Sequence, residues 1–133
     1  MKYWRPILLG IAVLFIGVFV SGTLDWSYFF PHIDKVYHFT GGFALGWFFY
    51  IYFSFEESQL SKFNKVFILV SSACFVSVFW EYAERLSSLY SLHHFPWLFH
   101  WFQGGGLTDT LLDILAGMTG SFTFGMLNTK PSK

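Results

Sequence analysis

Apolar residues along the chain gather into four long segments, which shorter polar stretches separate. These segments cover residues 6–24, 34–55, 63–86 and 107–127. Each has about the 17–25 residues that an α-helix needs to cross a bilayer. A backbone in lipid must satisfy its own hydrogen bonds, as a helix does. The pattern therefore predicts an all-α, polytopic membrane protein: a single domain, residues 1–133, built as a bundle of four transmembrane helices.

The first segment has a second interpretation, a secretory signal peptide. Lys2 and Arg5 precede its apolar core, and Ser21 and Gly22 follow it as small residues of a possible cleavage site. The sequence leaves open whether this helix is retained or removed.

The composition supports a membrane location and excludes other classes. Hydrophobic residues make up 54% of the chain and charged residues only 12%, whereas soluble domains carry about 25% charged residues. The net charge is zero, so nothing indicates a nucleic-acid partner. Cys74 is the only cysteine, which excludes an internal disulfide and a metal site made of several thiolates of one chain.

Basic residues predict the orientation, because cytoplasmic connections are enriched in Lys and Arg. With the N-terminus inside, the outer side keeps only Lys35 and Arg85. The cytoplasmic side collects the other six, which are Lys2, Arg5, Lys62, Lys65, Lys130 and Lys133. We therefore expect both termini to be cytoplasmic, in a protein of the bacterial cytoplasmic membrane.

Polar side chains occur in pairs at the ends of three predicted helices that this topology places outside. The pairs are Asp34 with His38, Glu81 with Glu84, and Asp109 with Asp113. A spacing of three or four residues puts both members on one helix face, separated in depth by about 4.5–6 Å. Two tiers are expected. Asp34, Glu84 and Asp109 form the outer tier, and His38, Glu81 and Asp113 lie one turn deeper.

This arrangement predicts a metal site, because five acids exceed the two bases near them. A charged acid at the centre of a membrane helix costs about 2.5–3.5 kcal/mol. Carboxylates with one imidazole suit zinc, manganese, magnesium or iron. The expected metal ligands are His38, Glu81, Asp113 and Asp34. Glu84 and Asp109 are the expected catalytic bases, acting on metal-bound water, and Arg85 and Lys35 are expected to bind a substrate phosphate.

A structural interpretation competes with this one. Asp34 can cap its helix, and Asp109 lies in a first turn, where the helix dipole favours acids. Glu81 and Arg85 are spaced for an ion pair along one helix. Capping and an interface position do not account for Glu81 and Asp113, which lie one turn inside membrane segments.

Small residues lie near these polar pairs and predict close helix packing. They are Gly41, Gly42 and Gly46 after His38, Cys74 and Ser77 before Glu81, and Gly117 and Gly120 after Asp113. The long connection at residues 87–106 is rich in aromatic residues, which is typical of a segment at the membrane interface. It is either a plain anchor or a lid that brings His93, His94 and His100 to the polar tiers.

Two stretches resemble motifs of a known family. DKVYHFTGGFALG (34–46) is similar to the D-K-x-x-H-F helix start of VanZ-like membrane proteins, and DTLLDILAGMTG (109–120) resembles their D-x-x-x-N-x-x-x-G helix. The E-x-x-E of Glu81 and Glu84 is closer to the YjdF-like inner-membrane branch. The resemblance implies a small helical protein of the cytoplasmic membrane. VanZ itself is associated with teicoplanin resistance, but Asp113 replaces its usual Asn here, which makes the site more acidic.

Three functions remain as hypotheses. The first is a metal-dependent hydrolase acting on a lipid or lipid-linked substrate at the outer leaflet. The second is a non-enzymatic binder of lipid headgroups, envelope precursors or a glycopeptide antibiotic. The third, metal or proton transport, is disfavoured because no ionisable residue continues through the cytoplasmic halves of the helices. Glycine and aromatic residues of the first helix would permit a homodimer.

Overall fold

The structure, a computed structural model, describes residues 3–23, 32–89 and 106–130, and the side chains of residues 3–17, 32–87 and 106–130. These residues form four α-helices: α1 (Trp4–Thr23), α3 (Ile33–Tyr52), α4 (Lys62–Leu89) and α6 (Leu107–Asn128). The all-α prediction is confirmed for this part of the chain, and the predicted boundaries lie within three residues of the observed ones. The proposed lid, with His93, His94 and His100, lies outside the described residues.

Two predicted helix ends were wrong by three residues. The second helix was expected to reach residue 55, but α3 ends at Tyr52. Ser54 has a φ of 51° and turns the chain, so that the Phe55 N–H donates to the Tyr50 carbonyl at 3.1 Å. The third helix was expected to end at residue 86, but α4 continues to Leu89 because no glycine or proline stops it.

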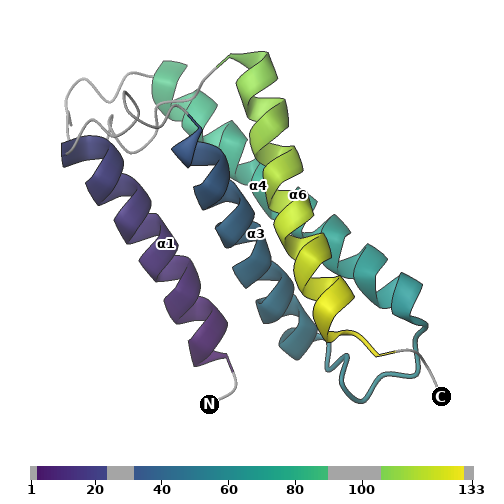
Figure 1. Cartoon of the computed structure of the whole chain (residues 1–133). Helices are drawn as coiled ribbons and strands as arrows, with labels where there is room; N and C mark the ends of the chain where they lie inside the picture. Colours follow the sequence, from purple (N-terminus) through teal and green to yellow (C-terminus); the bar gives the residue numbers. More distant parts are fainter. Residues whose placement is uncertain (1–2, 24–31, 90–105, 131–133) are drawn as a thin grey trace.

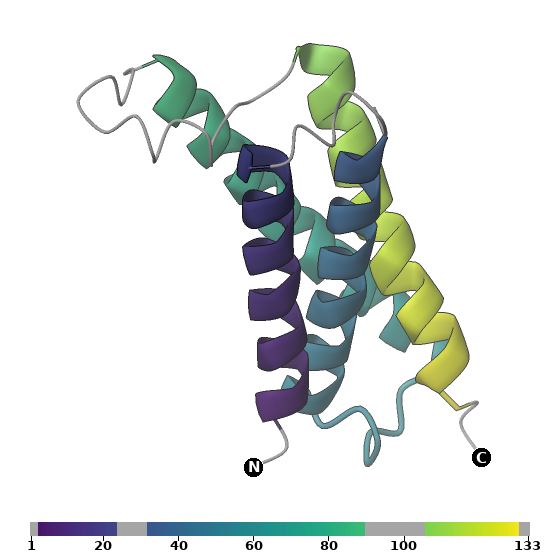
Figure 2. The same cartoon turned by 60° about the vertical axis from the view of Figure 1, so that its left-hand side comes forward.

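Helix α3 is the centre of the bundle and contacts α1, α4 and α6. Figure 1 shows α3 between α1 and α6, and Figure 2 shows α4 inclined to α1 and α3. The start of α3, the end of α4 and the start of α6 lie at the same end of the bundle, which we call the acidic end. The start of α1 and the end of α6 lie at the opposite end. Helix order alone thus brings the predicted polar pairs to one end.

Glycines allow α3 and α6 to pack backbone against backbone. A Cβ atom on Gly42 would overlap the carbonyl group of Gly117, and one on Gly120 would overlap the carbonyl oxygen of Phe39. Membrane helices gain van der Waals contact by such close approach. The predicted packing through small residues is confirmed for these glycines, whereas Gly41 has no neighbour where its Cβ would be.

A small aromatic core holds the bundle together nearer the opposite end. Phe124 is 4% exposed and forms edge-to-face contacts with Phe43 and Tyr50 and a stacked contact with Trp47. Such ring pairs add about 0.5–1.5 kcal/mol beyond the area they bury. The rings therefore fix the pairing of α3 with α6 at the end away from the polar residues.

The outward faces of the helices are apolar. Four phenylalanines of α4, which are Phe63, Phe67, Phe75 and Phe79, are between 59% and 75% exposed. Large exposed apolar patches are rare on soluble monomers. Two of the described helices, over Lys62–Ser87 and Leu107–Asn128, are long and apolar enough to cross a membrane by length and composition. Helix α3 is not one of these two helices, and its first turns carry Asp34, Lys35 and His38.

Candidate metal centre

The first turns of α3 carry three polar residues of the candidate site, which are Asp34, Lys35 and His38. Asp34 is in the first turn, where the positive end of the helix dipole favours an acid. One turn later, His38 lies on the same face, and its Nε2 is 3.6 Å from Asp34 Oδ1. The i,i+4 spacing seen in the sequence therefore brings a carboxylate and an imidazole together.

Lys35 bridges α3 and α6. Its Nζ donates to Asp109 Oδ1 and to Asp113 Oδ1, at 2.6 Å in each case, and it lies 3.3 Å from Asp34 Oδ2. Hydrogen bonds between charged groups are short and about twice as strong as neutral ones. One ammonium group therefore balances part of the charge of three carboxylates.

Glu81 brings a fourth carboxylate to the group from α4. Its Oε1 lies 4.0 Å from His38 Nε2, and the residue is only 6% exposed. This oxygen is buried and has no hydrogen-bond partner among the described residues. Leaving a buried polar group unpartnered costs about 1–3 kcal/mol, and more when the group is charged. The side chains around Glu81 therefore provide no hydrogen-bond donor to this one oxygen.

Burial follows the two tiers expected from the sequence. The outer side chains of Asp34 and Asp109 are 52% and 46% exposed. The deeper side chains of His38, Glu81 and Asp113 are 15%, 6% and 4% exposed. The deeper tier is thus shielded by the three helices, while the outer tier forms the rim.

Two predicted site residues do not join this group. Glu84 Oε1 accepts a hydrogen bond from Trp80 Nε1 at 2.5 Å. This partner was not predicted from the sequence, although a spacing of four residues places both side chains on one helix face. Arg85 is exposed and forms no ion pair with any residue in the described ranges. The expected pair between Glu81 and Arg85 is therefore absent, because Glu81 faces His38 inside the bundle.

Three donor atoms are close enough together to bind one metal ion. One ligand atom each from Asp34, His38 and Asp113 lies within 4.8 Å of the others, and His38 Nε2 is 3.7 Å from Asp113 Oδ1. Zinc bonds to nitrogen and oxygen are about 2.0–2.2 Å long, which places tetrahedral ligand atoms about 3.4 Å apart. Small side-chain movements would bring the three donors to that geometry.

Lys35 affects any metal at this position. A metal ion bound to Asp113 Oδ1 would lie near the ammonium group, which donates to the same oxygen, and the two positive charges would repel each other. Lys35 also donates a hydrogen bond to Asp109. This bond would remain if the lysine gave up its hydrogen bond to Asp113. The arrangement therefore permits metal binding only if the lysine releases Asp113.

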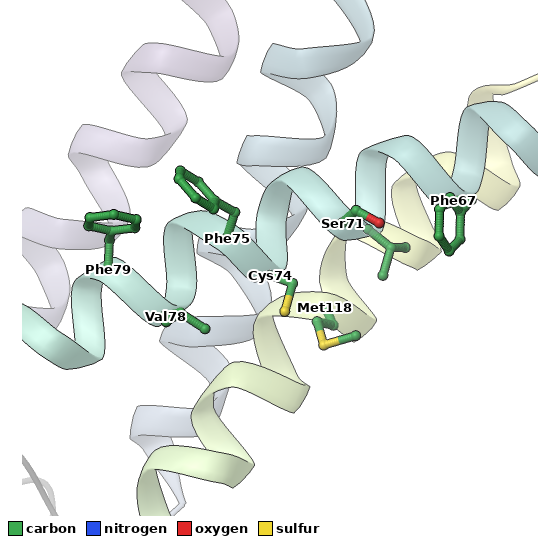
Figure 3. Close-up of a pocket in the computed structure, with 8 residues that line it drawn as sticks. Phe67, Ser71, Cys74, Phe75, Val78, Phe79 and Met118 are labelled. Carbon is green, nitrogen blue, oxygen red and sulfur yellow. The ribbon is translucent and has the colours of Figure 1, made fainter.

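An apolar groove lies on α4, away from these charges. It has a volume of about 490 Å³ and is lined by residues of α4 together with Met118 of α6. Figure 3 shows Cys74 and Phe75 beside it. Cys74, which we expected among the small residues of a helix interface, lies on this groove instead.

Comparisons with known proteins support the membrane assignment. The family described as "Predicted membrane protein (DUF2238)" matches residues 4–130. This family is related to YjdF, in agreement with the YjdF-like part of the resemblance, while membership of the wider VanZ-like group stays a prediction. No curated protein and no solved structure matches the chain. Because the match covers nearly the whole chain, the protein belongs to the DUF2238 family of predicted membrane proteins.

Proposed function

We propose that this protein binds a divalent metal ion at its acidic end, through Asp34, His38 and Asp113. The observation that carries the proposal is the approach of their three donor atoms to within 4.8 Å. The unpartnered Oε1 of Glu81, next to His38, supports it independently. One imidazole with carboxylates suits zinc, manganese or iron, and magnesium less well because it prefers oxygen donors alone.

The proposed reaction is hydrolysis of a phosphate ester in a lipid or lipid-linked substrate. A metal ion held by Asp34, His38 and Asp113 would supply an activated water by lowering its pKa, and a nearby base would take the proton of that water. The water oxygen then bonds to phosphorus, the bond to the leaving oxygen breaks, and that oxygen receives a proton. Lys35, once released from Asp113, would bind the phosphate through charge-assisted hydrogen bonds.

Glu81 is the best-placed base for this reaction. The sequence suggested Glu84 and Asp109, but Glu84 accepts a hydrogen bond from Trp80 and Asp109 accepts one from Lys35. The buried oxygen of Glu81 has no such partner. A base needs a free lone pair within reach of the water, directly or through one further water.

The proposed topology places this chemistry at the outer leaflet. Four membrane-spanning helices in one domain, with both termini in the cytoplasm, would leave Lys35 and Arg85 outside and the other basic residues inside. The meeting of the start of α3, the end of α4 and the start of α6 at one end is consistent with four spans. The substrate would then be a lipid or lipid-linked molecule of the bacterial cytoplasmic membrane.

The test uses the purified protein in liposomes of mixed phospholipids and lipid-linked phosphates. Products are followed by mass spectrometry, with chelator and after addition of zinc, manganese or magnesium. We expect metal-dependent release of a phosphate-containing or dephosphorylated product by the wild type. Glu81→Gln should bind metal but turn over at least about 100-fold more slowly, as is usual when a general base is removed. Turnover that is unaffected by chelator or by Glu81→Gln would refute the hydrolase.

A second candidate is a non-enzymatic binder of lipid headgroups or envelope precursors. The position of Lys35 favours it, because its ammonium already balances Asp109 and Asp113 without a metal ion. The group would then present carboxylates to the amine of a headgroup. Retention of a lipid by metal-free protein, without turnover, would favour this function over the hydrolase.

A further inference from the structure

A second hollow lies at the opposite end of the bundle, far along α3 from the acidic end. It has a volume of about 500 Å³, within the ~300–1,000 Å³ typical of ligand sites. Its lining comes from the start of α1, the end of α3, the turn that follows α3 and the end of α6. The residues that matter for the argument are Arg5, Trp47, Tyr50, Glu56 and Phe124.

The hollow carries one charge of each sign. Arg5 and Glu56 both line it and both are exposed, yet within the described ranges Arg5 forms no ion pair, with Glu56 or with any other acid. A guanidinium group binds phosphate in two-pronged geometry. A free carboxylate favours an ammonium group. Together they match a ligand that has both charges.

Three of the other five lining residues are aromatic, and Ile51 and Asn128 complete the lining. Trp47 stacks on Phe124 with ring centroids 6.4 Å apart, and Tyr50 meets Phe124 edge to face at 5.8 Å. Tryptophan and tyrosine are enriched where membrane helices reach the headgroup level. These rings would contact the glycerol and the first methylene groups of a lipid, while the charges remain at the rim.

We infer that this hollow binds the headgroup of a zwitterionic phospholipid, with its phosphate on Arg5 and its amine on Glu56. A lipid is favoured over a soluble ligand because the hollow lies at the end of apolar helices and its walls are aromatic. This site shares no residue with the proposed metal centre. Either proposal can therefore fail without the other.

Native mass spectrometry of the detergent-purified protein tests the inference. The protein is mixed with phosphatidylethanolamine or phosphatidylglycerol of matched acyl chains, and the retained lipid is quantified. We expect the wild type to retain the ethanolamine lipid in preference. Arg5→Gln should lower retention of both lipids about tenfold, the effect of losing one charge-assisted hydrogen bond. Glu56→Gln should lower retention of the ethanolamine lipid alone.

Glu57→Gln is the matched control, because Glu57 is exposed beside Glu56 but does not line the hollow. It should retain both lipids as the wild type does. Equal retention in all variants would overturn the inference, as would an equal effect of Glu57→Gln. Displacement of the lipid by water-soluble phosphorylethanolamine at the same concentration would also overturn it, in favour of a soluble ligand.

Discussion

The ammonium of Lys35 lies 2.6 Å from Asp113 Oδ1, although the two residues are 78 positions apart. Asp113 is 3% exposed, so this contact joins α3 to α6 at a shielded position. It supplies one positive charge where several carboxylates meet and leaves the buried oxygen of Glu81 without a partner. The acidic end is therefore only partly balanced by the protein itself.

Lys35→Met should reduce stability in the absence of metal. Breaking a buried ion pair by removing one partner costs about 3–5 kcal/mol, and we expect the low end because Asp109, the other main partner, is half exposed. Thermal unfolding in detergent with chelator measures the loss. Because Lys35 and a metal ion compete for Asp113, the same variant should bind zinc more tightly than the wild type.

Lys130→Met is the control for that experiment, since Lys130 is exposed near the end of the chain. It should leave both stability and zinc affinity unchanged. Weaker zinc binding by Lys35→Met would show that the lysine supports the metal site rather than competing for it.

Gly42→Ala should separate α3 from α6. The new Cβ would overlap the backbone of Gly117, and backbone cannot rotate away as a side chain can. We expect a loss of about 3 kcal/mol, the upper part of the range for overpacking. Gly41→Ala is the matched control, because nothing lies within 4 Å of its Cβ position. That variant should be as stable as the wild type or gain up to about 1 kcal/mol from helix propensity.

Ser121→Ala should have a small effect despite complete burial. Ser121 Oγ donates to the Leu69 carbonyl at 3.0 Å and thereby links α6 to α4. Hydrogen bonds between membrane helices contribute about 0.6 kcal/mol on average. We expect a loss of that size in the free energy of unfolding, measured in the same detergent. A loss as large as that of Gly42→Ala would contradict the view that close packing dominates.

Site-directed labelling tests the topology. Cys74→Ser provides a cysteine-free background, since Cys74 is the only cysteine. In that background, Gln59→Cys in the turn after α3 should react with a membrane-impermeant thiol reagent only after the cells are opened. Gly106→Cys, immediately before α6, should react in intact cells. Both positions are exposed. Labelling of both from the same side would refute the proposed orientation.

The meeting of polar residues at one end could be predicted from the sequence. The spacing of Asp34 with His38, and of Asp109 with Asp113, fixes the helix face, and alternating helix direction fixes the shared depth. The structure places these four residues together. The small residues between them fix how closely the helices approach, which Gly42 shows most clearly.

The partners of the long side chains could not be predicted. Lys35, whose predicted role in substrate binding stays a prediction, reaches across to Asp109 and Asp113. The flexible side chain of Lys35 can reach many partners. The distance between α3 and α6 decides that Asp109 and Asp113 are the ones it contacts. Glu84 likewise takes Trp80 as its partner. Helix periodicity gives the direction of a Cβ atom but not the position of a charged group at the end of a long side chain.

Metal content measured by mass spectrometry tests the central claim most directly. Purified protein is saturated with zinc, desalted and analysed beside His38→Gln and Asp113→Asn, with Glu57→Gln as the control. We expect about one zinc ion per chain in the wild type and the control. Both ligand variants should fold but retain almost none. Metal-free wild type would contradict the proposed metal centre, and so would His38→Gln and Asp113→Asn variants that retain as much zinc as the wild type.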